Sequence, residues 1–250
     1  MTATATDHAA IPLLCLPFAG AGASFYRPWR RLDVATIEVH PLQLPGREER
    51  LAEVPCVDFE TAVACLLPSV LEVARRYPVA LFGHSFGAVL AYELARKALE
   101  HDQDLVLHLI VSGSPVPWDG RRERASDCGD DEFVNRVEEF AGYCHPALRI
   151  SELRELLLPA LRADVHMHEH YSPRSATRLA VPITSVRGHD DHLVSAERAC
   201  RWREATSLRF DAVELPGGHM YLTEDPLSLL ELISDRLTRH PAEAHYAAAG

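Results

Sequence analysis

The sequence predicts an α/β fold, in which a mostly parallel central sheet is flanked by helices. Short β-rich runs alternate along the chain with longer stretches of helical periodicity. Most of the β-rich runs lack a polar alternation, which is typical of strands that are buried on both faces. The chain has 250 residues, which is enough for one sizeable core, so we expect residues 1–250 to form a single domain.

Six β-rich runs are the candidate strands, and helical patterns fill most of the connections between them. The strands are expected at residues 11–17, 37–42, 79–83, 107–112, 181–187 and 209–215. The helices are expected at residues 57–76, 87–100, 195–205 and 226–238.

Residues 118–178 interrupt this alternation. They contain no convincing strand, only a charged loop and two helical patterns at residues 131–141 and 151–171. A segment of this length without a strand predicts an insertion into the α/β domain, and such insertions often act as lids. An ordinary helical excursion without a gating role is the alternative. At the C-terminus, residues 241–250 are expected to form a disordered tail.

The composition argues against several classes of protein. The formal net charge of −11 disfavours a nucleic-acid binder, which needs clustered lysine and arginine to displace counterions from phosphates. No apolar run approaches the ~20 residues that span a bilayer, so no membrane association is expected. The N-terminal residues do not resemble a secretory signal. The six cysteines include no CxxC pair, so we expect reduced, buried thiols in a cytoplasmic protein.

The segment GHSFG at residues 83–87 is the first candidate for a catalytic motif. It follows the apolar run VALF and opens a helical pattern, which is the strand–turn–helix context of a nucleophile elbow. In such a tight turn, side chains at Gly83 and Gly87 would collide with neighbouring backbone. Ser85 is then held in a strained conformation above the sheet, at the amino end of the helix, where negative charge is favoured. The alternative is a turn serine that caps the helix.

Two later segments supply the base and the acid that a serine nucleophile needs. In α/β-hydrolases the chain order is serine, then acid, then histidine. Asp191 follows the strand pattern PITSVRG and is the predicted acid, with the neighbouring Asp190 as the alternative. His219 follows the strand pattern RFDAVEL on a glycine-rich loop and is the predicted base. Because open parallel sheets bind ligands at the carboxyl ends of their strands, we expect Ser85, Asp191 and His219 to form a catalytic triad.

Acyl transfer also requires an oxyanion hole, in which fixed amides stabilise the negative charge that develops on the carbonyl oxygen. The amide of Phe86, directly after the nucleophile, is the first predicted donor. The second is expected from the loop after the first strand, where small residues let the main chain approach a substrate closely. We predict Ala19 as this donor, and Phe18 and Gly20 are the alternatives.

Several longer blocks resemble the type II thioesterases that accompany polyketide synthases and non-ribosomal peptide synthetases. From about residue 11 to 225 they follow the order of the family and read LLCLPFAGAGASFYRPW, LQLPGREERLAE, ALFGHSFGAVLAYELAR, LLLPALRADVHMHEHY, PITSVRGHDD, WREATS and LPGGHMYL. The resemblance implies the α/β-hydrolase fold and a stand-alone enzyme of antibiotic biosynthesis. Such an enzyme hydrolyses acyl thioesters on the phosphopantetheine arm of acyl or peptidyl carrier proteins. It also implies a helical lid that shapes the acyl channel.

The resemblance further implies roles at individual positions. Glu169 and Tyr171 match the family's ExY pattern in the second helix of the insertion. Phe86 stands where many members have methionine, and its bulk is expected to narrow the choice of acyl group without affecting its backbone amide. Residues 119–130 match the family least well.

Two groups of charged residues allow more than one interpretation. His166, His168 and His170 alternate on a helical pattern, but 168 points away from the other two and no HExxH pattern is present, so neither a metal nor another cofactor is expected. We expect Arg47 and Arg50 to brace the loop near the active site. Two arginine-rich segments form either a docking surface for an acidic carrier protein or a solvated charged face. Their arginines are Arg27, Arg30, Arg31, Arg121, Arg122 and Arg124.

Three other functions remain open for this sequence. A small-ester esterase or an acyltransferase would use the same residues on the same fold. A binding module that has lost its chemistry is the third alternative, but such a protein would be expected to lack a member of the triad, and all three are present.

Overall fold

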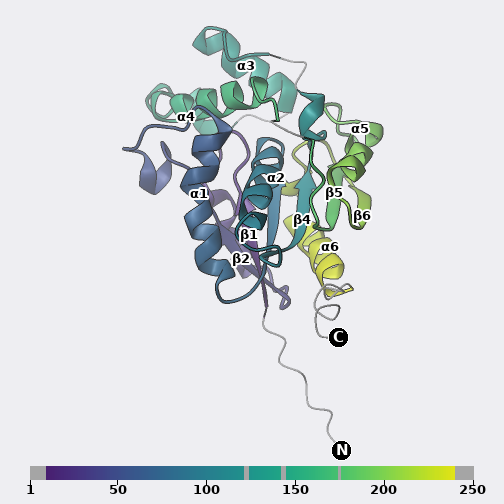
Figure 1. The fold of residues 1–250 in the computed structure, drawn as a ribbon. Coiled ribbons are helices and arrows are strands. Elements are labelled where there is room, and N and C mark those ends of the chain that lie inside the picture. Colours follow the sequence, from purple (N-terminus) through teal and green to yellow (C-terminus); the bar gives the residue numbers. More distant parts are fainter. Residues whose placement is uncertain (1–9, 121–123, 142–144, 174–175, 240–250) are drawn as a thin grey trace, which may run out of the picture.

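Six parallel strands form the sheet at the centre of the molecule (Figure 1). The computed structural model describes residues 10–120, 124–141, 145–173 and 176–239, and its strands follow the order β2-β1-β3-β4-β5-β6. They are β1 (Ile11–Leu16), β2 (Ile37–Pro41), β3 (Val79–His84), β4 (Val106–Ser112), β5 (Ile183–Gly188) and β6 (Phe210–Leu215). Each corresponds to a predicted strand with slightly shifted ends, so the predicted fold class is confirmed.

Helices cover both faces of the sheet (Figure 1). α1 (Phe59–Ala74) and α2 (Phe86–Leu99) pack against one face, and α6 (Pro226–Thr238) packs against the other. The helix expected after β5 is divided into the short α5 (Ala196–Cys200) and a 3₁₀ turn at Arg201–Ala205. In the part of the chain that the structure describes, no helix has both the length and the apolar character needed to cross a bilayer.

The strand order reverses beside β1, and this reversal positions the candidate site. β1 pairs with β2 on one side and with β3 on the other. The segment after β1 packs into the core beneath α6, whereas α2, which follows β3, packs on the opposite face. Loops that diverge in this way leave a crevice at the carboxyl ends of the two strands, where open α/β sheets bind ligands. Ala19 lies in the loop after β1, and Ser85 lies in the turn after β3.

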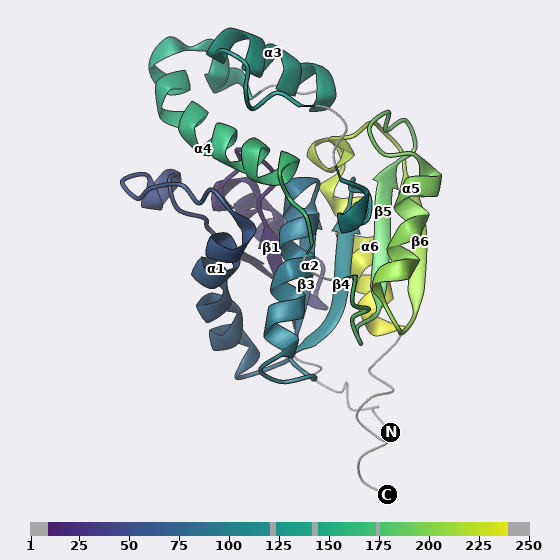
Figure 2. The same cartoon turned by 45° about the horizontal axis from the view of Figure 1, so that its top comes forward.

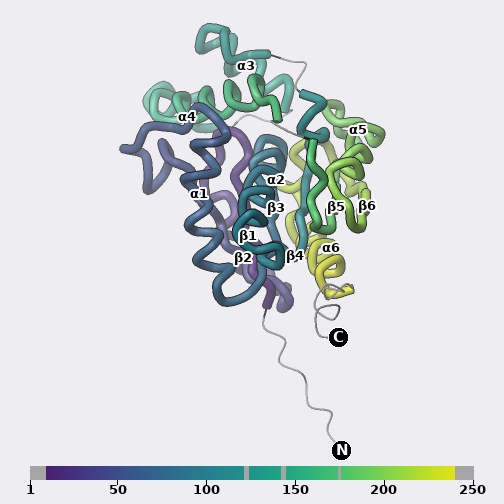
Figure 3. Tube along the Cα trace, viewed as in Figure 1, coloured from purple at the N-terminus to yellow at the C-terminus, as the bar shows by residue number. Residues whose placement is uncertain are grey.

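Two helices lie outside the layers of the sheet, above the carboxyl ends of its strands. α3 (Asp130–Ala141) and α4 (Ser151–Glu169) follow β4 and precede β5. The described residues of the segment that joins these two strands form no further strand. Figure 2 shows both helices across the end of the sheet, and the tube in Figure 3 traces the same course. They share a small hydrophobic cluster of their own, which contains Ala125, Phe133, Val134, Leu148, Leu158, Leu161 and Val165.

The cysteines do not share one environment. Cys15 and Cys56 are buried free thiols, as predicted, and burial raises the pKa of the Cys56 thiol to about 12. Cys200 is exposed, so the expectation that every cysteine is buried is wrong at this position. It is the last residue of α5, a short helix whose outer side faces solvent. Cys144 and the tail predicted at residues 241–250 lie outside the described residues.

Candidate active site

Ser85 lies in the tight turn between β3 and α2. Its backbone angles are φ 52° and ψ −116°, in a region that residues with a Cβ atom rarely adopt. Its amide donates a hydrogen bond to the carbonyl oxygen of Ser112 at 2.8 Å. A Cβ atom at Gly83 would lie 2.0 Å from the carbonyl oxygen of Gly87, and one at Gly87 would lie 2.6 Å from that of Pro17. Both positions therefore require glycine, as expected for a nucleophile elbow.

The imidazole of His219 and the carboxylate of Asp191 share a buried hydrogen bond of 2.8 Å between Nδ1 and Oδ2. Because a carboxylate can only accept, Nδ1 carries the proton and Nε2 is left to accept one from a hydroxyl. Asp191 Oδ1 accepts from the amides of Leu193 at 2.8 Å and Val194 at 3.1 Å. Burial acts to raise the pKa of Asp191, but the hydrogen bonds from His219 and these amides outweigh it and lower that pKa. Asp190, the alternative acid, is exposed.

Arg187 holds the turn that carries Asp191, a role that the sequence analysis missed. Its buried guanidinium donates to the carbonyl oxygens of Val194 at 2.8 Å, His189 at 3.0 Å and Asp191 at 3.1 Å. It also forms an ion pair with Glu214. The rigid fork of arginine can satisfy several acceptors in one geometry. The signal in the sequence was a charged residue near the end of an otherwise uncharged strand, four residues before the predicted acid.

The loop that carries the base rests on the turn that carries the acid. A Cβ atom at Gly188 would lie 2.1 Å from the carbonyl oxygen of Gly218 and 2.4 Å from that of Gly217. This backbone contact sets the separation of the two side chains, and only glycine permits it.

A second histidine, His84, lies next to the base, with its ring centroid 4.8 Å from that of His219. His84 Nδ1 shares a hydrogen bond of 2.9 Å with Ser112 Oγ, which shares another of 2.7 Å with the hydroxyl of Tyr221. Burial is the main cause that lowers the pKa of His84 well below its usual value; His219 lowers this pKa further, and Asp191 opposes the shift. His84 therefore stays neutral and does not repel a positive charge on the neighbouring imidazole.

The amides predicted for the oxyanion hole come from two segments. Phe86 is the first residue of α2, where an amide has no acceptor within the helix. Ala19 lies in the loop after β1 and lines the same cavity as the predicted nucleophile. Gly20, one of the alternatives, already donates its amide to Asp164 Oδ2 at 2.8 Å. The geometry therefore favours Ala19 or Phe18 over Gly20.

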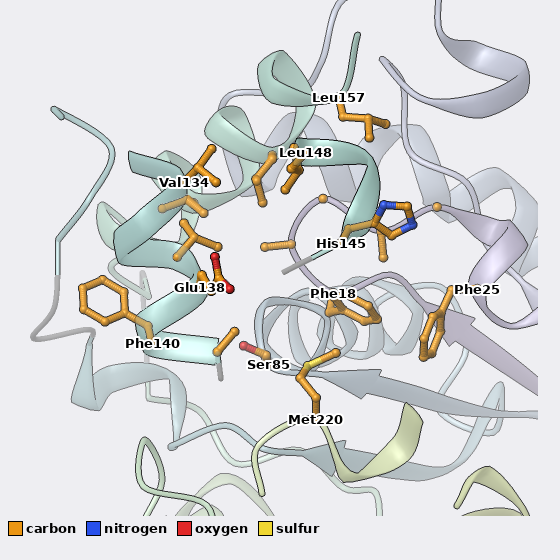
Figure 4. A pocket seen from close by; sticks show the side chains of 18 of the residues that line it. Phe18, Phe25, Ser85, Val134, Glu138, Phe140, His145, Leu148, Leu157 and Met220 are labelled. Carbon is orange, nitrogen blue, oxygen red and sulfur yellow. The ribbon is translucent and has the colours of Figure 1, made fainter. Parts of the chain in front are cut away.

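Ser85 and His219 both line a cavity of about 430 Å³ beneath α3 and α4 (Figure 4). In Figure 4, Phe18 and Met220 lie on the same side of this cavity as Ser85. The two helices contribute an apolar wall on the other side, which includes Val134, Val137, Phe140, Leu157, Leu161 and Val165. Cavities with apolar walls and a few polar groups are typical of sites for small molecules.

The residues that match the ExY pattern hold α4 to its surroundings. The Glu169 carboxylate accepts hydrogen bonds from the amides of Ala125 at 2.6 Å and Ser126 at 3.2 Å. The hydroxyl of Tyr171 donates to Glu93 on α2 at 2.5 Å. Neither side chain lines the cavity, so both affect the site only through the position of the helix.

The side chain of Phe86 does not have the predicted effect. It is fully buried and packs against Phe59 on α1, with the ring centroids 5.4 Å apart. It does not line the cavity, so the expectation that its bulk narrows the choice of acyl group is wrong. The first turn of α2 directs this ring into the core between two helices.

The histidines of α4 are divided between surface and interior. His166 and His170 are exposed, and their ring centroids lie 4.2 Å apart, whereas His168 is buried. No group of three or more residues suited to hold a metal ion is found within the described ranges.

The predicted arginines behave in different ways. Arg47 donates to the carbonyl oxygen of Ala21 at 3.0 Å and so braces the loop after β1, as expected. Arg50 instead pairs with Glu53 at 2.6 Å and donates to the carbonyl oxygen of Gln43. Arg121 and Arg122 lie outside the described residues. The other arginines proposed for docking are exposed, and they are Arg27, Arg30, Arg31 and Arg124.

Relatives of known sequence place the chain in a family. A family model described as a thioesterase domain matches residues 11–237. The chain is 31% identical over 238 residues to the gramicidin S biosynthesis protein GrsT of Aneurinibacillus migulanus, covering 95% of this chain and 93% of that protein. It is 30% identical over 240 residues to the probable anguibactin biosynthesis thioesterase AngT of Vibrio anguillarum, covering 93% and 94% of the two chains.

Solved structures agree with the relatives. The type II thioesterase BorB from the borrelidin biosynthetic cluster is 36% identical, with a TM-score of 0.81 over 91% of this chain and 93% of that one. The type II thioesterase YbtT from the yersiniabactin pathway is 28% identical, with a TM-score of 0.82 over 95% and 96% of the two chains. The resemblance to type II thioesterases is thus confirmed, and the chain belongs to the thioesterase family of α/β-hydrolases, whose members hydrolyse thioesters.

Proposed function

We propose that this protein is a stand-alone thioesterase that hydrolyses acyl thioesters on the phosphopantetheine arm of acyl or peptidyl carrier proteins. Ser85 is the nucleophile, His219 the base and Asp191 the acid. The amides of Ala19 and Phe86 form the oxyanion hole. The phosphopantetheine belongs to the carrier protein, so this chemistry requires no cofactor of the enzyme's own.

One observation carries the proposal. His219, which is hydrogen-bonded to the buried Asp191 at 2.8 Å, lines the same cavity as Ser85. The opposite wall of that cavity is mostly apolar, with Glu138 and His145 as its polar members. The carboxylate fixes the imidazole in the tautomer that can accept a proton from a serine hydroxyl. The apolar wall suits an acyl chain, because burying methylene groups there removes them from water.

The reaction has two steps. In the first, His219 removes the proton from Ser85 as its Oγ attacks the thioester carbonyl carbon, and the two amides stabilise the negative oxygen. The C–S bond then breaks, and the thiol leaves with the proton that His219 carried. In the second step, His219 accepts a proton from water, whose oxygen attacks the new ester. The carboxylic acid is released, and the proton returns to Ser85.

The insertion at residues 118–178 acts as a lid in this proposal. Its helices α3 and α4 supply the apolar wall of the cavity, and they are held together by a hydrophobic cluster separate from the sheet. An acidic carrier protein would have to approach a chain with a net charge of −11 through a locally basic surface. The candidates for that surface are the exposed Arg27, Arg30, Arg31 and Arg124.

The nucleophile is tested by the mass of the intact protein after a pulse of an acyl thioester. The wild type should gain the mass of one acyl group and lose it again, whereas Ser85→Ala should gain none. Loss of the nucleophile should slow hydrolysis on the order of 10⁴-fold or more. A Ser85→Ala variant that hydrolyses the thioester as fast as the wild type would overturn the assignment.

The substrate class is tested by comparing one acyl group on three carriers. The proposal predicts a higher kcat/KM for the acyl carrier protein than for a small acyl-thiol mimic or the matching ethyl ester. A preference for the free ester would indicate an esterase, and faster turnover in the presence of an amine or alcohol acceptor would indicate an acyltransferase. Failure of Ser85 to react with a fluorophosphonate probe would favour a binding module without chemistry.

A further inference from the structure

A buried ion pair from two distant segments holds the loop that carries Ala19. The carboxylate of Asp164, on α4, contacts the guanidinium of Arg47 at 2.6 Å and 2.8 Å in a bidentate arrangement. The Asp164 side chain is completely buried, and the Arg47 side chain is 3% exposed. Asp164 Oδ2 also accepts from the amide of Gly20 at 2.8 Å, and Arg47 donates to the carbonyl oxygen of Ala21 at 3.0 Å.

These contacts fix the turn from which the oxyanion donor would come. The amide of Gly20 belongs to the peptide group that joins Ala19 to Gly20, so Asp164 sets the plane of that peptide. The turn itself is closed by a hydrogen bond of 2.9 Å from the amide of Ala21 to the carbonyl oxygen of Phe18. The amide of Ala19 has no hydrogen-bond partner among the described residues, and its direction follows from the geometry of this turn.

The helix that holds the turn also covers the cavity. A Cβ atom at Gly20, which has φ 75°, would lie 2.8 Å from Cδ1 of Leu161. Leu161 and Val165 lie on either side of Asp164 along α4, and both line the cavity beside Ser85. A displacement of α4 would therefore change the cavity wall and the support of the loop together.

We propose that Arg47 and Asp164 are positioning residues for the oxyanion hole, so that the Ala19 amide is correctly aimed only while α4 is seated on the loop. This inference rests on the proposed function. An oxyanion donor is effective when it lies about 2.7–3.1 Å from the developing charge, and a misplacement of about 1 Å can cost roughly 100-fold in rate. A buried ion pair adds little to stability compared with apolar residues of similar volume, so its effect on rate can be separated from its effect on folding.

The decisive variant is the double substitution Arg47→Met with Asp164→Leu. It removes both charges together, so no single buried charge is left without a partner. The Gly20 amide and the Ala21 carbonyl lose one hydrogen bond each, so the variant should stay folded but unfold at a somewhat lower temperature than the wild type. The kcat for a small acyl thioester should fall on the order of 100-fold, with KM within about threefold of the wild type. An acyl trifluoromethyl ketone, whose hemiketal oxygen occupies the oxyanion hole, should lose affinity by a similar factor.

Two further variants make the result specific. Arg47→Lys keeps the charge but lacks the planar fork, so its kcat should lie between those of the wild type and the double variant. Arg162→Met is the matched control, because Arg162 ties the same helix to Asp130 and to the carbonyl oxygen of Ser126, away from the oxyanion loop. This control should keep kcat within about twofold of the wild type.

The inference is overturned if the folded double variant retains the wild-type kcat and ketone affinity, or if its loss lies entirely in KM. If the double variant does not fold, Arg47→Lys decides in the same way. A wild type that hydrolyses no acyl thioester would instead refute the proposed function. If the wild type is active and the Arg47 and Asp164 variants are equally active, only the positioning role is refuted.

Discussion

At the scale of single residues, burial and hydrogen bonds decide which groups of the site carry charge. Asp191 is kept ionised by the hydrogen bonds that lower its pKa, whereas His84, beside the base, is kept neutral by burial. In the proposed mechanism, His219 is therefore the imidazole of the pair that takes the proton from Ser85.

The adjacent aspartates provide a matched pair of variants. Asp191→Asn keeps the shape of the acid but no longer fixes the tautomer of His219, so kcat should fall on the order of 10⁴-fold. Asp190→Asn changes an exposed side chain and should retain activity within about twofold. Steady-state hydrolysis of an acyl-thiol mimic measures both, and comparable losses in the two variants would contradict Asp191 as the acid.

The neutral state of His84 predicts how the stability of the fold depends on pH. Below about pH 6.5 the unfolded chain binds a proton at His84 that the folded protein does not bind. The free energy of unfolding should therefore be largest above that pH and should decrease as the pH falls from 6.5 toward 5. His84→Gln removes this contribution, so the decrease should become shallower by at most about 1.4 kcal/mol per pH unit.

Urea unfolding at a series of pH values measures this slope. His101 is exposed, so His101→Gln should keep the slope of the wild type and serves as the control. An identical slope for His84→Gln and the wild type would show that His84 accepts a proton in the folded state. This result would contradict the claim that His84 is neutral in the folded protein.

At the scale of elements, the site depends on loops that touch one another through glycine backbone. Gly188→Ala should place a Cβ atom 2.1 Å from the carbonyl oxygen of Gly218 and push the base loop away from the acid turn. We expect a loss of stability of about 1–3 kcal/mol and a fall in kcat of roughly 100-fold. Gly218→Ala is the matched control, because a Cβ atom there would meet nothing within 4 Å.

Thermal unfolding and steady-state kinetics of the two alanine variants separate these effects. Gly218→Ala should stay close to the wild type in both measurements. If Gly188→Ala were as stable and as active as Gly218→Ala, the close contact between the two loops would not set the geometry of the site.

The elements were predictable from sequence because their signals are local. The central strands β1 and β3 begin as continuous apolar runs, and GHSFG between a strand and a helix indicates the elbow. Arg187 and the pair of Arg47 with Asp164 escaped prediction for other reasons. Arg187 donates to main-chain carbonyl oxygens of the turn that follows it, and the pattern of side chains does not reveal such contacts. Arg47 and Asp164 are 117 residues apart in the sequence, and only the folded chain brings them together. The division of the helix after β5 also left no clear signal in the apolar pattern.

At the scale of the whole molecule, the sheet carries the proposed reacting groups, and the insertion supplies the wall of the cavity that faces them. Ser85 and His219 follow strands, whereas α3 and α4 contribute half of the apolar residues that line the cavity. The insertion has a hydrophobic cluster of its own, although Met167 of α4 packs in the core of the sheet. Cavity-lining residues of that separate cluster can therefore change without moving the segments that carry Ser85 and His219. Residues of the insertion should therefore determine which acyl groups the enzyme accepts.

Val137, on the face of α3 that lines the cavity, tests this division of roles. Val137→Trp fills part of a cavity of about 430 Å³, so long acyl chains lose space while an acetyl group still reaches Ser85. Because each methylene in an apolar pocket is worth about 1–3 kcal/mol, we expect kcat/KM for an octanoyl thioester to fall at least about tenfold relative to acetyl. Asn135→Trp places the same ring on an exposed position of α3 and should leave the ratio unchanged. Equal ratios in both variants would mean that the acyl chain does not occupy this cavity.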